Sequence, residues 1–342
     1  MKKYILIILL FSISCREEIS LDLDSPDTQI VVQGSIEAGF PPYVILTKNS
    51  GYFDPIDINT YENLFIKNAN VSVIRSDGEI EELEYIEEYG IYTNKLAVVS
   101  MITNSTFSYD FSVEGEQYDL IITWNNSTVN ARTTIPHATP LDSIWIEATP
   151  DPDDPKFKCN INAMYTDPDT LGNNILIRSK RIQHYKRDTV SAYPADTIQL
   201  DNDPLLLLVD CGPDILINGT SFPTYFPKPS EDGGFPTESY RGSHYKTYKD
   251  TTTVGKDSVY TPEDIVLLKF CQVDEPAMRF WRGVVRNSTS GGNPFAEPMN
   301  LVSNINGGLG AWTGYGATYY NIPIIEGSSI MNEYQPNILE IF

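Results

Sequence analysis

The chain has 342 residues, and 24 lysines and arginines against 46 aspartates and glutamates give it a formal net charge of −22. Nucleic-acid binders carry a basic surface, so we expect no nucleic-acid partner. Three scattered histidines and four cysteines without a C-x-x-C pair form no ligand pattern, and we therefore expect no metal and no cofactor.

The first 14 residues are typical of a bacterial lipoprotein signal peptide. Lys2 and Lys3 precede an apolar run at 4–13, which is too short for a bilayer core that needs about 20 residues. We expect residues 1–14 to be removed and Cys15 to receive acyl chains such as palmitate, which would attach the protein to outer-membrane lipid. An ordinary secretory peptide with an incidental cysteine is the alternative.

Residues 15–27 are expected to form an acidic tether. Its first residues after the cysteine, Arg16, Glu17 and Glu18, resemble the export tag that directs lipoproteins to the outer face of the outer membrane in Bacteroidetes. The predicted location is therefore the outer membrane, lipid-anchored and facing the cell exterior. A solvated tether on a protein of the periplasmic face is the alternative.

Residues 28–138 read as short strands and predict an immunoglobulin-like or prealbumin-like β-sandwich. Asp77-Gly78 and Asn125-Asn126 mark two hairpins, because these residues tolerate the positive φ of tight turns. The expected strands are 30–36, 43–47, 69–74, 118–124 and 127–133.

Residues 139–342 predict a second β-rich domain, which begins after Pro136 and Pro140 interrupt the strand pattern. One helix is expected near 275–289, capped by Asp274 and stopped by Ser290-Gly291-Gly292. A long irregular insertion is expected at 213–258. The expected strands are 143–147, 160–165, 174–178 and 265–270. The fold class is thus mainly all-β, with two antiparallel sandwich-like domains.

Side chains outside the strand pattern give weak functional signals. An oxidising compartment permits one disulfide, for which Cys159 and Cys211 are the candidates, whereas Cys271 suits a buried strand. The basic group at 178–181 is interpreted as a solvated face. The run at 167–172 begins like a calcium loop but lacks the later acidic ligand, which favours a turn.

Tyrosines in and beside the predicted insertion form a candidate surface for a ligand or partner, because tyrosine offers amphipathic contact area. Packing of the same rings onto their own domain is the alternative. The candidate residues are Tyr225, Phe226, Tyr240, Tyr245 and Tyr248.

The C-terminal segments 291–298 and 303–315 resemble the signature of a Bacteroidetes lipoprotein family catalogued as domain of unknown function 4249. The signature needs no catalytic explanation, because its glycines permit close backbone approach and Phe295 and Trp312 can anchor a closing segment. The resemblance implies a two-part β-rich surface lipoprotein, often encoded beside a TonB-dependent transporter, and it supplies no catalytic residues. Further landmarks are 30–36, 68–71, 90–92, 115–120 and 165–168.

Together these features predict a non-enzymatic binding or accessory subunit of a TonB-dependent (SusC-like) outer-membrane transporter. An accessory scaffold of an outer-membrane assembly or secretion complex is the alternative. A surface hydrolase with a carboxylate pair is the third hypothesis, although no nucleophile elbow or phosphate-binding loop occurs in the sequence.

Overall fold

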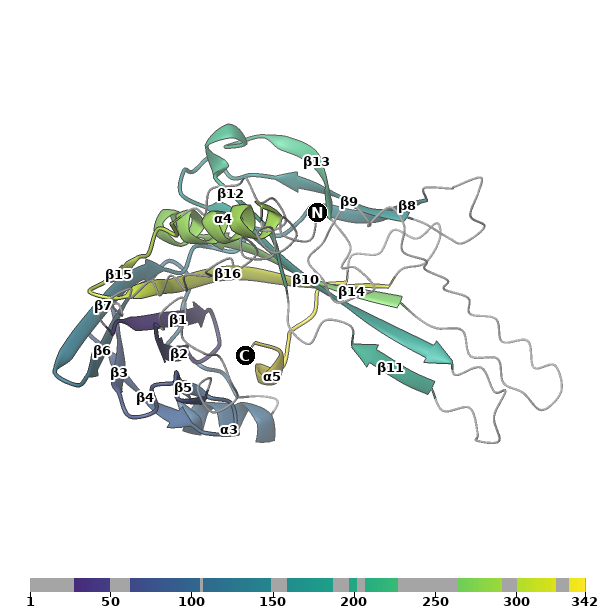
Figure 1. The fold of residues 1–342 in the computed structure, drawn as a ribbon. Coiled ribbons are helices and arrows are strands. Elements are labelled where there is room, and N and C mark those ends of the chain that lie inside the picture. Colours follow the sequence, from purple (N-terminus) through teal and green to yellow (C-terminus); the bar gives the residue numbers. More distant parts are fainter. Residues whose placement is uncertain are drawn as a thin grey trace, which may run out of the picture.

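The computed structural model describes residues 28–49, 62–104, 107–148, 159–186, 197–201, 207–226, 264–290, 300–323 and 332–341. These ranges form a mainly β protein, as predicted (Figure 1). A sheet of 13 strands has the order β11-β10-β14-β16-β1-β2-β5-β4-β3-β6-β7-β15, with β12 also pairing with β10. A second sheet of three strands has the order β13-β9-β8.

The strands of the first half follow the predicted pattern closely. They are β1 (Ile30–Glu37), β2 (Tyr43–Lys48), β3 (Asn70–Arg75), β4 (Ile80–Ile86), β5 (Ile91–Thr93), β6 (Gln117–Trp124) and β7 (Ser127–Thr134). Both predicted hairpins are present: Gly78 has φ +92°, and Asn125 and Asn126 have φ of 47° and 64°. Their positive φ angles are the ones that tight hairpin turns require.

The strands of the second half include several that the sequence pattern does not reveal. They are β8 (Ser143–Ala148), β9 (Cys159–Thr166), β10 (Asn174–Lys186), β11 (Thr197–Asp201), β12 (Leu207–Gly212), β13 (Ser221–Phe226), β14 (Asp264–Val273), β15 (Ile305–Asn306) and β16 (Leu309–Pro323). The expectation of an irregular run from 213 is wrong at β13 and at the short 3-10 helix η1 (Asp214–Leu216). Pro223 argues against a strand, but β13 is an edge strand, where proline is tolerated.

The described residues also contain the helices α3 (Lys95–Thr103), α4 (Glu275–Ser290) and α5 (Ile338–Ile341). Only α4 was predicted, and its cap is confirmed, because the Asp274 Oδ1 accepts a hydrogen bond of 3.0 Å from the Ala277 N–H. The second oxygen accepts bonds from the Thr133 hydroxyl and the Thr134 N–H at 2.8 and 3.0 Å. One carboxylate therefore starts the helix and ties it to β7.

Strand β16 connects the two halves of the chain. Its residues 309–315 run parallel to β1, and its residues 316–323 run antiparallel to β14. The large sheet is therefore continuous across the predicted boundary near residue 138. Trp312 of β16 is completely buried in the first hydrophobic cluster, among side chains of β1 to β7.

The glycines of the C-terminal signature allow this strand to lie close to its neighbours, as expected. A Cβ built on Gly314 would lie 2.3 Å from the carbonyl oxygen of Thr134. Gly310 has φ +107°, and a Cβ there would collide with the carbonyl of Val32. A side chain at either position would force the strand away from its neighbours.

Successive residues of β14 point to opposite faces of the large sheet, and both faces are covered. Val266, Leu268 and Phe270 pack with the three-stranded sheet in a second hydrophobic cluster. Cys271 and Val273 pack with α4 in a third cluster. Strand alternation thus gives the sheet two apolar faces at this point.

Two further expectations for the second half are wrong. Cys211 is a buried free thiol with its Sγ 3.7 Å from the Met278 carbonyl oxygen, so it forms no bridge to Cys159, whereas Cys271 is buried as predicted. The disulfide fails because Cys211 lies under α4 while Cys159 belongs to the small sheet. Arg178 is not on a solvated face, because its guanidinium lies 4.5 Å over the ring of Trp281.

Several predicted residues lie outside the described ranges, among them Cys15, Arg16, Glu17, Glu18, Tyr240, Tyr245 and Tyr248. The signal, tether and domain divisions therefore stay predictions. In the part of the chain that the structure describes, no helix is long and apolar enough to cross a membrane.

Candidate functional site

A groove of about 360 Å³ lies where β1, β16 and the segment before α5 meet. Its polar lining is rich in carboxylates and phenols, which suits binding of cationic or hydroxyl-bearing groups. We call it the Glu37 groove, and it is lined by Glu37, Ala38, Phe40, Glu114, Ala317, Thr318, Tyr319, Glu333, Tyr334 and Gln335.

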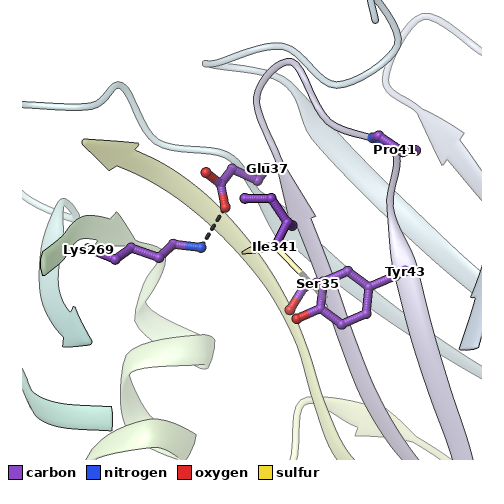
Figure 2. A pocket seen from close by; sticks show the side chains of 6 residues that line it. All are labelled: Ser35, Glu37, Pro41, Tyr43, Lys269 and Ile341. Atoms are coloured by element: carbon purple, nitrogen blue, oxygen red, sulfur yellow. Dashed lines mark hydrogen bonds and ion pairs between the residues drawn. The ribbon is translucent and has the colours of Figure 1, made fainter. Parts of the chain in front are cut away.

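Behind the groove, Glu37 forms a buried ion pair with Lys269, at 2.5 Å between Oε2 and Nζ (Figure 2). Ser35, Tyr43 and Ile341 line a cavity of about 10 Å³ beside the pair. A cavity of that size holds at most one water molecule. Glu37 lines both the cavity and the groove, whereas Lys269 lines the cavity alone, and the two side chains are only 6% and 8% exposed.

The register of three strands brings the two charges together. Glu37 lies opposite Tyr315 across β1 and β16, and Lys269 lies opposite Tyr319 across β16 and β14. The ammonium lies 4.4 Å from the Tyr315 ring centroid and 5.2 Å from that of Tyr319. The Tyr319 hydroxyl donates a 3.0 Å hydrogen bond to Glu37 Oε2. Two aromatic faces and one hydroxyl thus replace part of the lost hydration.

The electrostatics of this cluster keep the lysine charged. Burial is the largest influence and lowers the pKa of Lys269, but the charge of Glu37, with smaller contributions from Cys271, Tyr315 and the Glu37 hydrogen bond, leaves the pKa above its usual value. Burial, followed by the charge of Glu37, raises the pKa of Tyr319 well above its usual value. The cluster therefore holds a cation beside a neutral phenol.

The outer carboxylate Glu114 is held by the segment that follows β7. It accepts a 3.1 Å hydrogen bond from the Ala138 N–H, and its other oxygen lies 3.3 Å from His137 Nδ1. On the opposite side, the Tyr334 N–H donates to the Tyr319 carbonyl at 3.0 Å, and the two rings lie 5.9 Å apart. The walls of the groove are therefore attached to β7 and β16.

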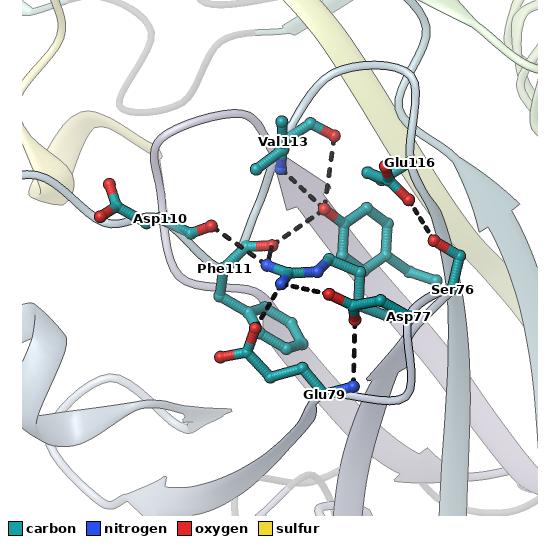
Figure 3. Close-up of polar contacts among 9 residues, drawn as sticks. Ser76, Asp77, Glu79, Asp110, Phe111, Val113 and Glu116 are labelled. Carbon is teal, nitrogen blue, oxygen red and sulfur yellow. Dashed lines mark hydrogen bonds and ion pairs between the residues drawn. The ribbon is translucent and has the colours of Figure 1, made fainter.

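The loop that carries Glu114 is held by polar contacts, and Figure 3 shows those of Asp77, Asp110 and Phe111. The Arg75 guanidinium donates to the carbonyl oxygens of Asp110 and Phe111 at 3.2 and 3.1 Å. The guanidinium also forms a 2.6 Å ion pair with Asp77, a residue of the β3–β4 hairpin. The hairpin and the loop between α3 and β6 therefore form one hydrogen-bonded unit at this end of the sheet.

A second surface feature lies on α3, at the lower edge of the molecule in Figure 1. Its inner residue Val98 packs against Ile338 of α5. Its outer residues Leu96, Val99 and Ile102 are exposed, and Lys95 is its only charged residue. Large aliphatic side chains on the outer face of a helix are usually covered, so this face is a candidate for contact with a partner.

The sequence-predicted loop residues contribute little to this site. Tyr225 and Phe226 lie on β13, opposite Asn162 and Ile161 of β9, and the others fall outside the described ranges. Sequence reasoning missed Glu37 and Lys269. Each is a charged residue at a buried position of an apolar strand, and such residues are almost never buried unless they are paired.

Among the described side chains, no group of three or more histidine, cysteine, aspartate or glutamate residues is placed to hold a metal ion. A comparison with curated proteins finds no match. The family model described as a domain of unknown function (DUF4249) matches residues 16–320, which is most of the sequence and contains Glu37, Lys269 and β16 up to Tyr320. The chain therefore belongs to the DUF4249 family.

Proposed function

We propose that this protein is an outer-membrane lipoprotein that acts as a non-enzymatic accessory subunit of a TonB-dependent transporter on the exterior face. The observation that carries the proposal is the exposed apolar face of α3. Anchoring through Cys15 would confine the protein to one membrane, where an integral partner is always near.

The chemistry of α3 favours a protein partner. The chain carries a net charge of −22, yet α3 contains no acidic residue and leaves three large aliphatic side chains in solvent. Exposed apolar residues that cluster in this way mark interaction sites. The helix would supply apolar contact area while the surrounding carboxylates remain at the rim.

The same contact would reach the Glu37 groove. Val98 of α3 packs on Ile338 of α5, and the chain just before α5 contributes Glu333 and Tyr334 to the groove wall. A partner bound on α3 would therefore press on the segment that closes one side of the groove. This arrangement suits a subunit that holds a ligand beside a transporter.

Two valines provide a matched test. Val99 on α3 is 50% exposed, and Val302, which precedes β15, is 57% exposed. The Val99→Glu variant should lose co-purification with the transporter from detergent-solubilised outer membranes, because a charge in an apolar contact is strongly unfavourable. The Val302→Glu variant should retain it.

Recovery of the wild-type protein only as a free species would contradict the proposal, as would equal behaviour of the two variants. Recovery with an outer-membrane assembly or secretion machine, lost in Val99→Glu, would favour the scaffold hypothesis instead. The melting temperatures of the two variants are compared to separate misfolding from loss of contact. If both variants shift equally and only Val99→Glu fails to co-purify, the failure reflects a lost contact.

A further inference from the structure

Two loops at one end of the three-stranded sheet bring an excess of oxygen atoms together. The loop at 167–173 joins β9 to β10, and the turn at 214–220 joins β12 to β13. They are tied together by the Asp167 N–H, which donates to the Thr220 carbonyl at 3.0 Å. None of the residues of these two loops lines the Glu37 groove.

Each of these loops carries a buried carboxylate. Asp167 is 2% exposed and Asp214 is 4% exposed. Asp167 Oδ1 accepts a 2.9 Å hydrogen bond from the Tyr165 hydroxyl, but its buried Oδ2 has no hydrogen-bond partner. Asp214 Oδ2 accepts a 2.7 Å bond from the Gly172 N–H. The buried Oδ1 of Asn218, on the same turn, is also without a hydrogen bond.

The amide of Asn173 lies against both loops. With its nitrogen turned toward them, it donates to the Thr170 carbonyl and, at 2.8 Å, to Asp214 Oδ2, and this satisfies both acceptors. Turned the other way, its oxygen joins these two oxygen atoms and its nitrogen donates to Asp167 Oδ1 at 3.4 Å. A bound cation would favour the second arrangement, and in neither does Asp167 Oδ2 gain a hydrogen bond.

No fixed positive charge compensates these groups in the described part of the chain, where neither Asp167 nor Asp214 forms an ion pair. Burial raises the pKa of Asp167, as does the charge of Asp214, although hydrogen bonds from the Tyr165 hydroxyl and the Gly219 backbone lower it in part. Unpaired buried carboxylates are costly, and either a bound cation or a proton relieves the cost.

We propose that Asp167, Asp214, Asn173 and the Thr170 carbonyl bind a divalent cation of the calcium type. Calcium prefers carboxylate, amide and backbone carbonyl oxygens in an irregular shell of six to eight ligands. Two carboxylates from separate loops supply the charge, and water completes the coordination. The sequence supplies the first acidic position at Asp167, and the tertiary fold replaces the missing later ligand with Asp214.

The cation would fix the β9–β10 loop to the turn that begins β13, and so stabilise the small sheet. This inference is independent of any transporter partner. Its probe is the metal ion itself, added to the purified full chain after removal of bound cations with EDTA.

Two readouts test the site directly. At a calcium concentration tenfold above the dissociation constant, the melting temperature should rise by about 3 °C. Terbium should bind in place of calcium and emit on excitation of tyrosine, because the Tyr165 hydroxyl lies 2.9 Å from Asp167 Oδ1. Magnesium should shift the melting temperature less, since it demands stricter octahedral geometry.

The isosteric variants Asp167→Asn and Asp214→Asn should lose both the calcium shift and the terbium emission. In EDTA they should melt at or above the wild-type temperature, because each removes one of two repelling charges. Asp119→Asn is the control, since Asp119 pairs with Arg132 on the surface of β6. It should keep both signals.

A wild-type protein whose melting temperature and terbium emission do not respond to these ions would overturn the proposal. The same conclusion would follow if Asp167→Asn and Asp214→Asn kept the calcium shift. Stability in EDTA that falls as the pH rises from about 4 to 7, with no effect of calcium, would instead assign a shared proton to the two carboxylates.

Discussion

The buried pair of Glu37 and Lys269 offers the sharpest test of how the two halves of the sheet are held together. The Lys269→Met variant keeps most of the side-chain volume and removes the charge. Glu37 would then stay buried with the Tyr319 hydroxyl as its remaining donor. Removal of one partner from a buried pair costs about 3–5 kcal/mol, so we expect a loss of unfolding free energy in that range.

A second ion pair of nearly the same length provides the control. Lys67 and Glu87 lie 2.6 Å apart, but their side chains are 47% and 73% exposed, against 8% for Lys269 and 6% for Glu37. Lys67→Met should therefore leave the free energy of unfolding within measurement error, because solvent screens exposed pairs.

Urea unfolding of a double-mutant cycle measures the coupling. Adding Glu37→Leu to Lys269→Met should recover most of the loss, because two apolar groups replace two charges and no unpaired carboxylate remains. The stabilising role of the buried pair is refuted if Lys269→Met lowers the free energy of unfolding by less than about 1 kcal/mol. It is also refuted if the losses of the Glu37→Leu and Lys269→Met single variants simply add in the double variant.

Three further outcomes follow from buried contacts. Gly314→Ala should lower the free energy of unfolding in urea by about 2–3 kcal/mol, because its new methyl group would lie 2.3 Å from a backbone oxygen. Gly212→Ala, with open space around it, should leave that free energy unchanged. Equal effects of the two variants would contradict this reasoning. Asp274→Ala should cost about 2 kcal/mol through the lost helix cap and lost bonds to β7, with Asp274→Asn costing less; unchanged stability would refute the role of the cap. Burial raises the pKa of Cys271 to about 12 and that of Cys211 further. A thiol reagent at pH 8 should therefore label neither cysteine until urea is added. Rapid labelling of these two thiols in the folded protein would disprove this.

The raised pKa of Lys269 fixes how the stability contributed by the buried pair changes at alkaline pH. The folded-state pKa of Lys269 is raised, so its stabilising contribution is complete below the ordinary lysine pKa of about 10.4. It is lost as the pH rises through the higher folded value. The stability difference between the wild type and Lys269→Met, followed by urea unfolding from pH 9 upward, should therefore shrink only above that ordinary value. A difference that shrinks between pH 6 and 9 would point to another group.

Local features of the fold could be predicted from the sequence because their causes lie within a few residues. The two hairpins follow from Asp77-Gly78 and Asn125-Asn126, whose side chains and backbone tolerate positive φ. Helix α4 follows from its apolar period and from Asp274 as its cap. Helix α3 was missed, because a nine-residue segment with apolar residues on both its inner and its outer face shows no amphipathic period.

The candidate site could not be predicted, because its parts come from distant strands. Glu37 and Lys269 were visible as charges within apolar runs, and this pattern indicates that each needs a partner. Their pairing depends on β16, which lies between β1 and β14 and sets the register of both. Nothing within β1 or β14 alone specifies that neighbour.

The sequence by itself determined the mainly β class, the two hairpins, the helix cap and the close approach of the C-terminal glycines, because each depends on local backbone preference or side-chain size. Tertiary structure alone decided which strands are neighbours, and therefore that Trp312 completes the first core, that Cys211 remains a free thiol, and that the loop of Asp167 meets the turn of Asp214. Strand pairing is a long-range choice among many apolar segments of similar composition. Its outcome is fixed by the packing of the whole chain.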